Sequence, residues 1–352
     1  MNLFIIGNGF DSAHGYETKY CFFRKWMEER ILAVHPEYEM NVDPKTGHLV
    51  IDEIPDIPDV QIDNHGEEIL DEDMATELLM WLLLYNPTIG DDWSEFEASL
   101  HDLDLLAILD SCSDLIDQSA IDKEGDLNPF WQGAGYEELA GNIYFSVAKI
   151  KSLFRQWIED VDIYSKPKLA IGKLMSNHDR YLSFNYTETL EKVYGVPAYL
   201  VNHIHGIRMS ARSVIHPNEK LGFMPSFGDL VIGHGSDDAR LDFHTEHIAS
   251  ENLLQRTIRE LRKDVDQIIA KNHKFWEELK LVGITDVYTF GFSYSDVDMP
   301  YIETIVRIIE GNKDIMKHVW YLNQYDDSNG NNAVYEDKIR GCGYTGRFGR
   351  FV

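Results

Sequence analysis

Glycine-rich and polar segments follow short apolar runs at several places in the sequence, and there the chain can present chemical groups to a ligand. The first segment, Gly7-Asn8-Gly9-Phe10-Asp11, follows the apolar run 3–6. Its glycines allow a tight turn that brings backbone N–H groups close to a phosphate. The spacing differs from the dinucleotide motif GxGxxG, because the next glycine, at position 15, lies six residues after Gly9. The segment is therefore either a phosphate-binding loop or a plain turn from a strand into a helix.

An asparagine follows a second strand candidate. Asn185 comes directly after the run 180–184 and just before a helical stretch that begins at Thr187. Open α/β sheets bind ligands at the carboxyl ends of their strands. Because an amide both donates and accepts hydrogen bonds, Asn185 suits the orientation of a ribose hydroxyl or a water molecule. The alternative is that Asn185 or Thr187 caps the helix.

Two histidines follow a third strand candidate, 198–203. The alternation of a strand places His203 and His205 on one face, and Gly206 follows them. A histidine can take up a proton near neutral pH, as a general base does. Each of the two is therefore either a site residue or a hydrogen-bonded core residue.

A fourth segment follows the strand candidate 287–291. Gly291 and Ser293 form a turn that can contact a ligand. Ser295 and Asp298 are a typical capping pair for the next helix, and this local role is compatible with a ligand at the turn.

A metal centre is an alternative for the histidine-rich part of the chain. Six of the 14 histidines lie between His203 and His247, with several aspartates among them. Histidines and carboxylates are common metal ligands, and His244 and His247 share one face if they are helical. No fixed motif such as HExxH is present, so the first expectation is a site without a metal.

Strand and helix patterns alternate around these segments. After the first strand, the expected elements include helical segments between 67 and 161, a strand at 230–232 and a long amphipathic helix at 251–269. Alternating strands and helices predict an α/β fold, with a Rossmann-like parallel sheet covered by helices on both faces. This domain is expected to consist of residues 1–35 and 166–352. An acidic, mainly helical insertion, 36–165, interrupts it.

The charge of the chain is concentrated in that insertion. The 352 residues include 60 acidic and 32 basic ones, a formal net charge of −28, and residues 37–126 hold 26 of the acids but only two of the bases. Such a balance disfavours broad binding to nucleic acid or to anionic membranes. The acidic residues are either simply solvated or form an interface, lid or trigger-sensing surface that prefers a basic partner.

Cysteine use and the apolar runs indicate the cellular compartment. The three cysteines lie far apart and form no CxxC pair, which fits a reducing compartment. The chain has neither a secretory signal pattern at residue 1 nor an apolar run long enough to cross a bilayer. We therefore expect a cytoplasmic protein.

The order of the segments resembles known families. The glycine spacing of residues 7–15 resembles the phosphate loop of sirtuins, residues 183–191 resemble their TTNYD-type segment, and His205-Gly206 and Gly291-Phe292-Ser293 match later sirtuin turns. The bacteriophage abortive-infection AbiH family is a closer likeness, over nearly the whole chain. The segments that carry it are IIGNGFD (5–11), WSEFEASL (93–100), SFNYTETLE (183–191), HIHG (203–206), VIGHG (231–235) and FGFSYSDVDMPY (290–301).

This resemblance implies a sirtuin-like fold and an antiphage abortive-infection effector that cleaves NAD to nicotinamide and ADP-ribose. It places Asn185 and His205 in catalytic roles, with His203 a second candidate for the base. The residues that it places around NAD are Gly7, Asn8, Gly9, Phe10, Asp11, Gly291 and Ser293. Glu17 and Thr187 depart from the sirtuin pattern, and the zinc-binding cysteine pairs of deacetylases are absent, which disfavours protein deacetylation.

Three points stay open. The chain could bind NAD or a related nucleotide as a sensor without cleaving it. It could instead be a metal-dependent phosphoesterase or nuclease that uses the cluster from His203 to His247. A toxic activity must be inhibited before infection, which implies control by assembly of several copies or by a partner.

Overall fold

The computed structural model describes residues 1–65, 68–90, 92–208, 230–235, 248–311, 318–328 and 330–351. The chain forms two compact units. Unit 1 contains residues 1–19, 158–231 and 263–352, and unit 2 contains residues 20–157 and 232–262. The expected domains meet at 35/36 and 165/166, whereas the units meet at 19/20 and 157/158, so helix α2 (Tyr20–Val34) belongs to unit 2 and residues 158–165 belong to unit 1. Residues 232–262 also belong to unit 2.

The elements of unit 1 are β1 (Leu3–Ile6), α1 (Asn8–Ala13), α8 (Leu169–Gly172), β4 (Arg180–Ser183), α9 (Thr189–Tyr194), η2 (Ala198–Leu200), β5 (Val201–His203), α11 (Val265–Lys271), α12 (His273–Val282), β6 (Asp286–Phe290), η4 (Asp296–Asp298), α13 (Met299–Gly311), β7 (Val319–Asn323), α14 (Tyr325–Ser328), α15 (Asn331–Gly341) and β8 (Arg347–Phe351). The elements of unit 2 are α2, η1 (Pro36–Asn41), β2 (Gln61–Ile62), β3 (Glu68–Ile69), α3 (Glu72–Leu84), α4 (Phe96–Ser99), α5 (Leu105–Ser119), α6 (Pro129–Ala148) and α10 (Ile248–Glu260). Helix α7 (Ile150–Asp160) contains the boundary at 157/158.

Unit 1 is built on a parallel sheet. In the described part of the chain this sheet has six strands in the order β5-β4-β1-β6-β7-β8, and every pair is parallel. With the strands renumbered along the chain, this is the order 3-2-1-4-5-6 of the doubly wound dinucleotide-binding fold. The strand order reverses beside β1, which lies between β4 and β6. The expectation of an α/β fold with a Rossmann-like parallel sheet is therefore confirmed.

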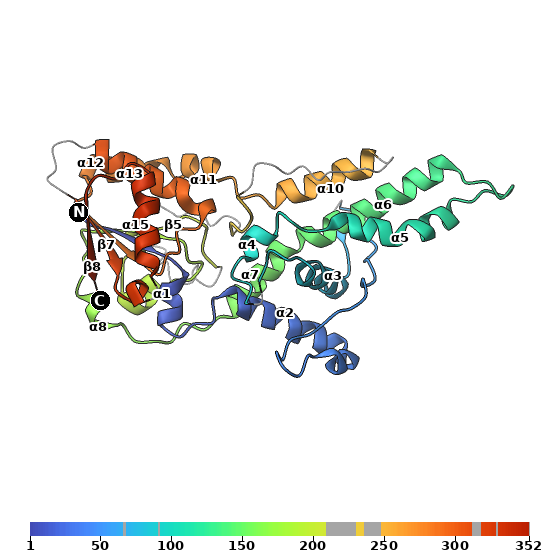
Figure 1. Ribbon diagram of the computed structural model, residues 1–352, viewed down its shortest axis with the longest axis horizontal. Helices are drawn as coiled ribbons and strands as arrows, with labels where there is room; N and C mark the ends of the chain where they lie inside the picture. Colours follow the sequence, from blue (N-terminus) through green and yellow to red (C-terminus); the bar gives the residue numbers. More distant parts are fainter. Residues whose placement is uncertain are drawn as a thin grey trace. The chain divides into compact units, whose positions relative to one another are not determined.

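Each face of the sheet is covered by helices (Figure 1). Leu3 and Ile5 of β1 point into one apolar core, which includes side chains of α11, α12, α13 and α15. Phe4 and Ile6 point into a second core on the opposite face, which includes side chains of α1, α8 and α9. Because successive side chains of a strand alternate between faces, the uninterrupted apolar sequence of β1 is buried on both sides.

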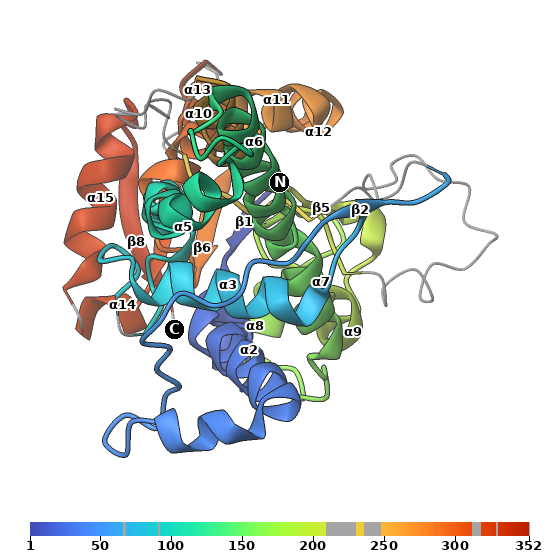
Figure 2. The ribbon, with the colours of Figure 1, turned by 90° about the vertical axis from the view of Figure 1, so that its right-hand side faces the viewer.

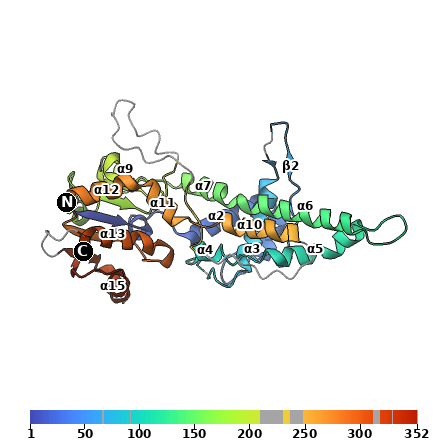
Figure 3. The same ribbon diagram turned by 90° about the horizontal axis from the view of Figure 1, so that it is seen from above.

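Unit 2 is mainly helical. Helices α2 and α3 pack together (Figure 2), and α6 packs against α3, α5 and α10. Helices α5 and α6 run side by side and are joined by a short connection, so that they form a helical hairpin (Figure 3). A pair of two-residue strands, β2 and β3, is antiparallel.

Two expected elements differ in the structure. The helix expected at 251–269 consists of α10 and α11, because Asp264 starts a new helix by accepting a hydrogen bond from the N–H of Gln267. Residues 230–232 form no strand; Val231 instead makes a single backbone bond to the carbonyl of His205. Among the described helices, none combines the length and the apolar composition that crossing a membrane requires.

Candidate active site

The motif segments meet at one edge of the sheet in unit 1. Ile6, at the end of β1, pairs with Ser183 of β4 and with Phe290 of β6, and Ser183 pairs with His203 of β5. The segments that begin at residues 7, 184, 204 and 291 therefore all leave the sheet at its carboxyl edge. This is the edge at which doubly wound sheets bind ligands, beside the point where the strand order reverses.

Three glycines hold the segments after β1 and β6 in direct contact. A Cβ atom on Gly7 would lie 2.4 Å from the carbonyl oxygen of Gly291, and one on Gly9 would lie 2.6 Å from the Cα of Gly291. Gly291 has a φ of +64°, which other residues rarely adopt. Only glycine at these positions permits this approach of the two backbones.

The backbone N–H groups of the first segment form hydrogen bonds within the protein. Gly7 donates to the carbonyl of Phe290, Gly9 donates to that of Gly291, and Phe10 donates to that of Gly7. These three N–H groups fix the loop, as in the alternative of a plain turn from a strand into a helix. The backbone geometry thus explains the glycine spacing as a close packing of two loops.

The side chains of Asn8 and Phe10 also have structural partners. The amide of Asn8 donates to the carbonyl of Thr18 and accepts from the Thr18 hydroxyl. The ring of Phe10 is fully buried against His14, Tyr194 and Phe290. Asn8 therefore fixes the loop, and Phe10 belongs to the core.

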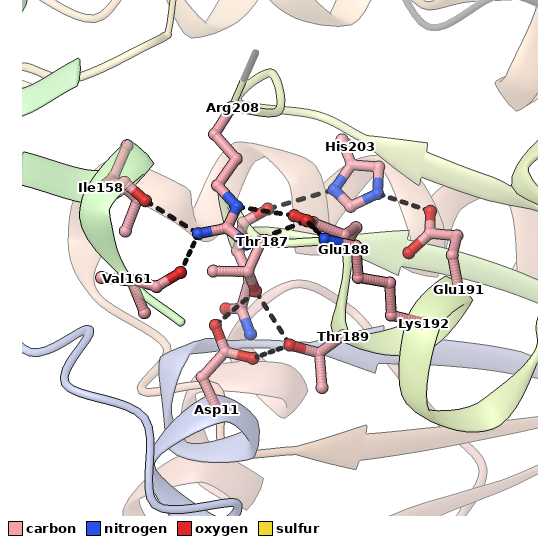
Figure 4. Close-up of polar contacts among 11 residues, drawn as sticks. Asp11, Ile158, Val161, Thr187, Glu188, Thr189, Glu191, Lys192, His203 and Arg208 are labelled. Atoms are coloured by element: carbon pink, nitrogen blue, oxygen red, sulfur yellow. Dashed lines mark hydrogen bonds and ion pairs between the residues drawn. The ribbon is translucent and has the colours of Figure 1, made fainter. Parts of the chain in front are cut away.

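Asp11 is a buried carboxylate at this edge (Figure 4). Its two oxygens accept hydrogen bonds from the hydroxyls of Thr187, at 2.6 Å, and Thr189, at 2.7 Å. Burial raises the pKa of Asp11 to about 6, although these hydrogen bonds, Asn185 and the charge of His203 act in the opposite direction. Asp11 is thus a carboxylate that changes its charge close to neutral pH.

Asn185 lies beside Asp11, and its amide is close enough to lower the pKa of that carboxylate as a hydrogen-bond donor does. The residue is 6 % exposed, and neither its amide oxygen nor its amide nitrogen has a hydrogen-bond partner among the described residues. Its backbone is fixed, because the N–H donates to the hydroxyl of Ser183 and the carbonyl accepts from His203. Buried polar groups without partners are rare and point to a ligand or water that satisfies them. The helix-cap alternative for Asn185 does not hold, since α9 starts at Thr189 without a side-chain cap.

His203 is a buried cation. Its Nδ1 lies 3.1 Å from the carbonyl oxygen of Asn185, and its Nε2 lies 2.9 Å from a carboxylate oxygen of Glu191. When Glu191 is ionised, both partners accept hydrogen bonds, and both ring nitrogens then donate, as in the protonated imidazolium. Burial alone would lower the pKa of His203, but the Glu191 carboxylate outweighs it and raises that pKa. A protonated histidine cannot serve as a general base.

His205 is buried and neutral. Its ring packs against Phe184 and Tyr301, and its Nε2 has no hydrogen-bond partner among the described residues. The nearest carboxylate oxygen, on Asp298, is 3.6 Å away and also lies 3.4 Å from the Nζ of Lys263. Burial is the larger cause and the charge of Lys263 the smaller one, and together they hold the pKa of His205 well below its ordinary value. Of the two histidines, only His205 has a nitrogen able to accept a proton.

A buried arginine anchors the segment that carries Thr187 (Figure 4). Arg208 binds both carboxylate oxygens of Glu188, at 2.7 and 2.8 Å, and donates to the carbonyls of Ile158 and Val161. Burial raises the pKa of Glu188, but its hydrogen bonds from Arg208 and Lys192 outweigh this and lower that pKa to about 2. Neither Glu188 nor Arg208 is predicted from the sequence, because charged residues are usually exposed.

The remaining predicted site residues are less informative. Ser293 is exposed. The hydroxyl of Ser295 donates to the Asp298 carboxylate at 3.0 Å, but the Ser295 side chain makes no capping hydrogen bond to a backbone N–H, so the expected capping pair is not formed. His234 lies in unit 2, where its Nε2 contacts the carbonyl of Ile258. In the part of the chain that the structure describes, no three His, Cys, Asp or Glu residues are arranged to hold a metal ion. His216, His244 and His247 lie outside that part.

The arrangement can stabilise a positive charge and position a nucleophile. A carboxylate held by two hydroxyls, an amide beside it and a neutral histidine at the same edge are groups that act in the cleavage of a glycosidic bond. The roles of Thr187 and Thr189 are not predicted from the sequence. Their alternation with Asn185, at positions 185, 187 and 189, is the signal that could have identified them.

Comparison with known proteins identifies a family. The family model described as bacteriophage abortive infection AbiH matches residues 3–320, which is most of the chain. No curated protein and no solved structure matches.

Proposed function

The chain belongs to the bacteriophage abortive infection AbiH family, and from this premise we propose that it is an NAD glycohydrolase whose activity arrests an infected cell. The family description indicates a role in defence against phage, and the family resemblance seen in the sequence motifs is thereby confirmed. The cleavage of NAD, a sirtuin-like fold and the residue roles below are our proposal.

The observation that carries the proposal is the amide of Asn185. It is buried beside Asp11, whose pKa its amide lowers, and neither of its two polar atoms makes a hydrogen bond of good geometry among the described residues. These groups occur where the strand order of a Rossmann-like sheet reverses, which is the usual place for a nucleotide. A dinucleotide with a ribose hydroxyl at Asn185 would satisfy the amide.

In the proposed reaction, water replaces nicotinamide at C1′ of the ribose. The C1′–N bond breaks, nicotinamide leaves with the bonding electrons, and a C1′–O bond forms to water, which releases a proton. The transition state carries positive charge on the ribose, so the ionised carboxylate of Asp11 would stabilise it. Asn185 would orient the ribose or the water, and the neutral His205 would accept the proton.

The test is an NAD-consumption assay on the wild type and Asn185→Ala, with and without phage infection. We expect NAD to fall in infected cells that carry the wild type, and to remain with Asn185→Ala. Asn41→Ala, which changes an exposed asparagine of unit 2, is the matched control and should behave as the wild type. If NAD stays intact during protection while Asn185→Ala and His205→Ala both abolish that protection, the proposed activity is wrong.

One alternative shares the same site. The group that carries the proposal is an amide, which binds and orients a ligand but does not exchange protons. A module that binds NAD or an ADP-ribose derivative without cleaving it would need the same Asn185. Tight binding of NAD by the purified protein, with no turnover in infected or uninfected extracts, would favour this sensor. In either case we propose control by assembly of several copies or by a partner.

A further inference from the structure

The connection between α5 and α6 presents large apolar side chains to solvent. Phe130 is 78 % exposed and Trp131 is 49 % exposed, both in the first turn of α6. Ile121 and Leu127 are exposed as well, and they pair across an antiparallel bridge that places their side chains on the same side. We name these four residues the hairpin tip. Exposed aromatic and aliphatic side chains concentrated in one short segment are typical of a binding surface.

The hairpin tip is held in a defined shape by its own hydrogen bonds. Asp122 donates its N–H to the carbonyl of Asp126, and its side chain accepts from the N–H groups of Glu124 and Asp126. Asn128 caps α6 by accepting from the N–H groups of Phe130 and Trp131. The two exposed aromatic residues therefore lie in a helical turn whose start is fixed by these hydrogen bonds.

The helices behind the tip are also closely packed. A Cβ atom on Gly135 of α6 would lie 3.0 Å from a methyl carbon of Ile116 of α5. The side-chain amide of Gln132 donates to Asp117 at 2.6 Å. A surface that is ordered before binding loses less conformational entropy when a partner docks.

The charge around the tip is strongly negative. Residues 110–126 contain the acids Asp110, Asp114, Asp117, Asp122, Glu124 and Asp126, and Lys123 is the only base in this range. Aromatic anchors surrounded by charges of one sign are complementary to an apolar recess surrounded by charges of the other sign. The same carboxylates repel nucleic acid, anionic lipid and the equivalent tip of a second copy.

We propose that the hairpin tip docks onto another protein, whose surface carries lysine or arginine side chains around an apolar recess. Phe130 and Trp131 enter the recess, and the carboxylates at the rim select the basic partner and speed its encounter. The proposal does not depend on NAD cleavage, because it rests on residues of unit 2 alone.

The test is site-specific crosslinking in cells. The full chain, with Phe130 replaced by the photoreactive p-benzoylphenylalanine, is irradiated with and without phage infection, and crosslinked peptides are identified by mass spectrometry. We expect an adduct to a different protein, on a segment with a net positive charge. Trp131→Ser and the pair Glu124→Lys and Asp126→Lys should each lower the adduct yield about tenfold, since buried aromatic anchors and complementary charges dominate such interfaces.

Matched variants separate this docking from general effects. Met40→Ser removes an exposed apolar side chain elsewhere in the acidic stretch, and Glu39→Lys reverses an exposed charge there. Both should leave the adduct yield unchanged. The proposal is overturned if the crosslinks form only to a second copy of this chain, to nucleic acid or to lipid, if none forms in either state, or if Trp131→Ser leaves the yield unchanged.

Discussion

Thr187 lies 176 residues after Asp11, and its hydroxyl donates a 2.6 Å hydrogen bond to the Asp11 carboxylate. This bond connects the segment after β1 to the segment after β4, so that a group from each strand contributes to one polar cluster. Because the carboxylate is buried, its ionisation lowers the stability of the folded protein. Changes to this cluster, or to the contacts that hold it, should therefore alter both stability and function.

Replacement of Asp11 by asparagine is expected to stabilise unit 1 and to abolish protection against phage. The pKa of Asp11 is about 6 in the folded protein, against an ordinary value of 3.8, so the ionised carboxylate destabilises the fold above pH 6. This shift corresponds to about 3 kcal/mol, and roughly half of it is relieved at pH 5. Hydrogen exchange of the β1 and β4 amides at pH 5 and pH 8 measures the difference. If the gain in stability of Asp11→Asn over the wild type is the same at pH 5 and pH 8, the raised pKa is contradicted.

The close contact between the glycine loops predicts a severe effect of Gly291→Ala. The new Cβ atom would lie 2.3 Å from the N of Phe10, and the residue would keep an unfavourable φ of +64°. Gly195→Ala is the matched control, because its φ is +68° but nothing lies within 4 Å of the added carbon. We expect the control to lose about 1–2 kcal/mol and Gly291→Ala to lose several kcal/mol or fail to fold. Urea denaturation measures both, and equal losses would show that the contact is unimportant.

Replacement of Glu191 by glutamine is expected to lower the pKa of His203. The carboxylate is the partner that outweighs burial and keeps the imidazolium charged. His203 stabilises the folded wild type fully below its unfolded pKa of about 6.5, and this stabilisation disappears as the pH rises through the raised folded pKa. NMR titration, with His203→Gln to assign the signal, measures the shift. The exposed Glu137→Gln serves as the control, and an unchanged titration in Glu191→Gln would refute the cationic assignment.

Removal of the buried arginine is expected to destabilise unit 1. Arg208→Met leaves Glu188 without its bidentate partner and two backbone carbonyls without a donor, at a cost of about 3–5 kcal/mol. The pKa of Glu188, which is about 2 in the folded protein, should rise. In the wild type the ion pair of Glu188 and Arg208 stabilises the fold fully above pH 4.5, and this stabilisation is lost as the pH falls towards 2.

The comparison for that variant is an exposed ion pair. Arg256→Met breaks the contact of Arg256 with Glu260, which is open to solvent and should therefore change stability far less than Arg208→Met does. Hydrogen exchange within each unit compares the two variants. Similar small losses at both positions would show that Arg208 does not anchor the site segment.

The sequence predicts the sheet well, because its signals are local. Leu3 to Ile6 are all apolar and end at a glycine, which indicates a strand buried on both faces. Asn185 is likewise placed correctly at a strand end, since that requires only the strand and the helix beside it. The break between α10 and α11 is not predicted, because the amphipathic pattern continues through the capping residue Asp264.

The roles of individual site residues depend on partners that are distant in the sequence. The N–H of Gly9 bonds to the carbonyl of Gly291, and nothing near Gly9 reveals that this acceptor exists. A phosphate-binding interpretation is natural for the glycine spacing when the neighbouring strand is unknown. For the same reason, the difference between His203 and His205 becomes visible only when Glu191 and Lys263 are placed beside them.

The central position of β1 has a consequence for the synthesis of the protein. Leu3 of this strand pairs with Arg180 on one side and with Val287 on the other. At a translation rate of about 5–20 residues per second, the second partner leaves the ribosome roughly 15 to 60 seconds after the first strand. During this time β1 has at most one of its two neighbouring strands, since β4 is synthesised before β6. A chain whose translation stops before residue 291 lacks Gly291, and the close packing of the two glycine loops cannot form in it.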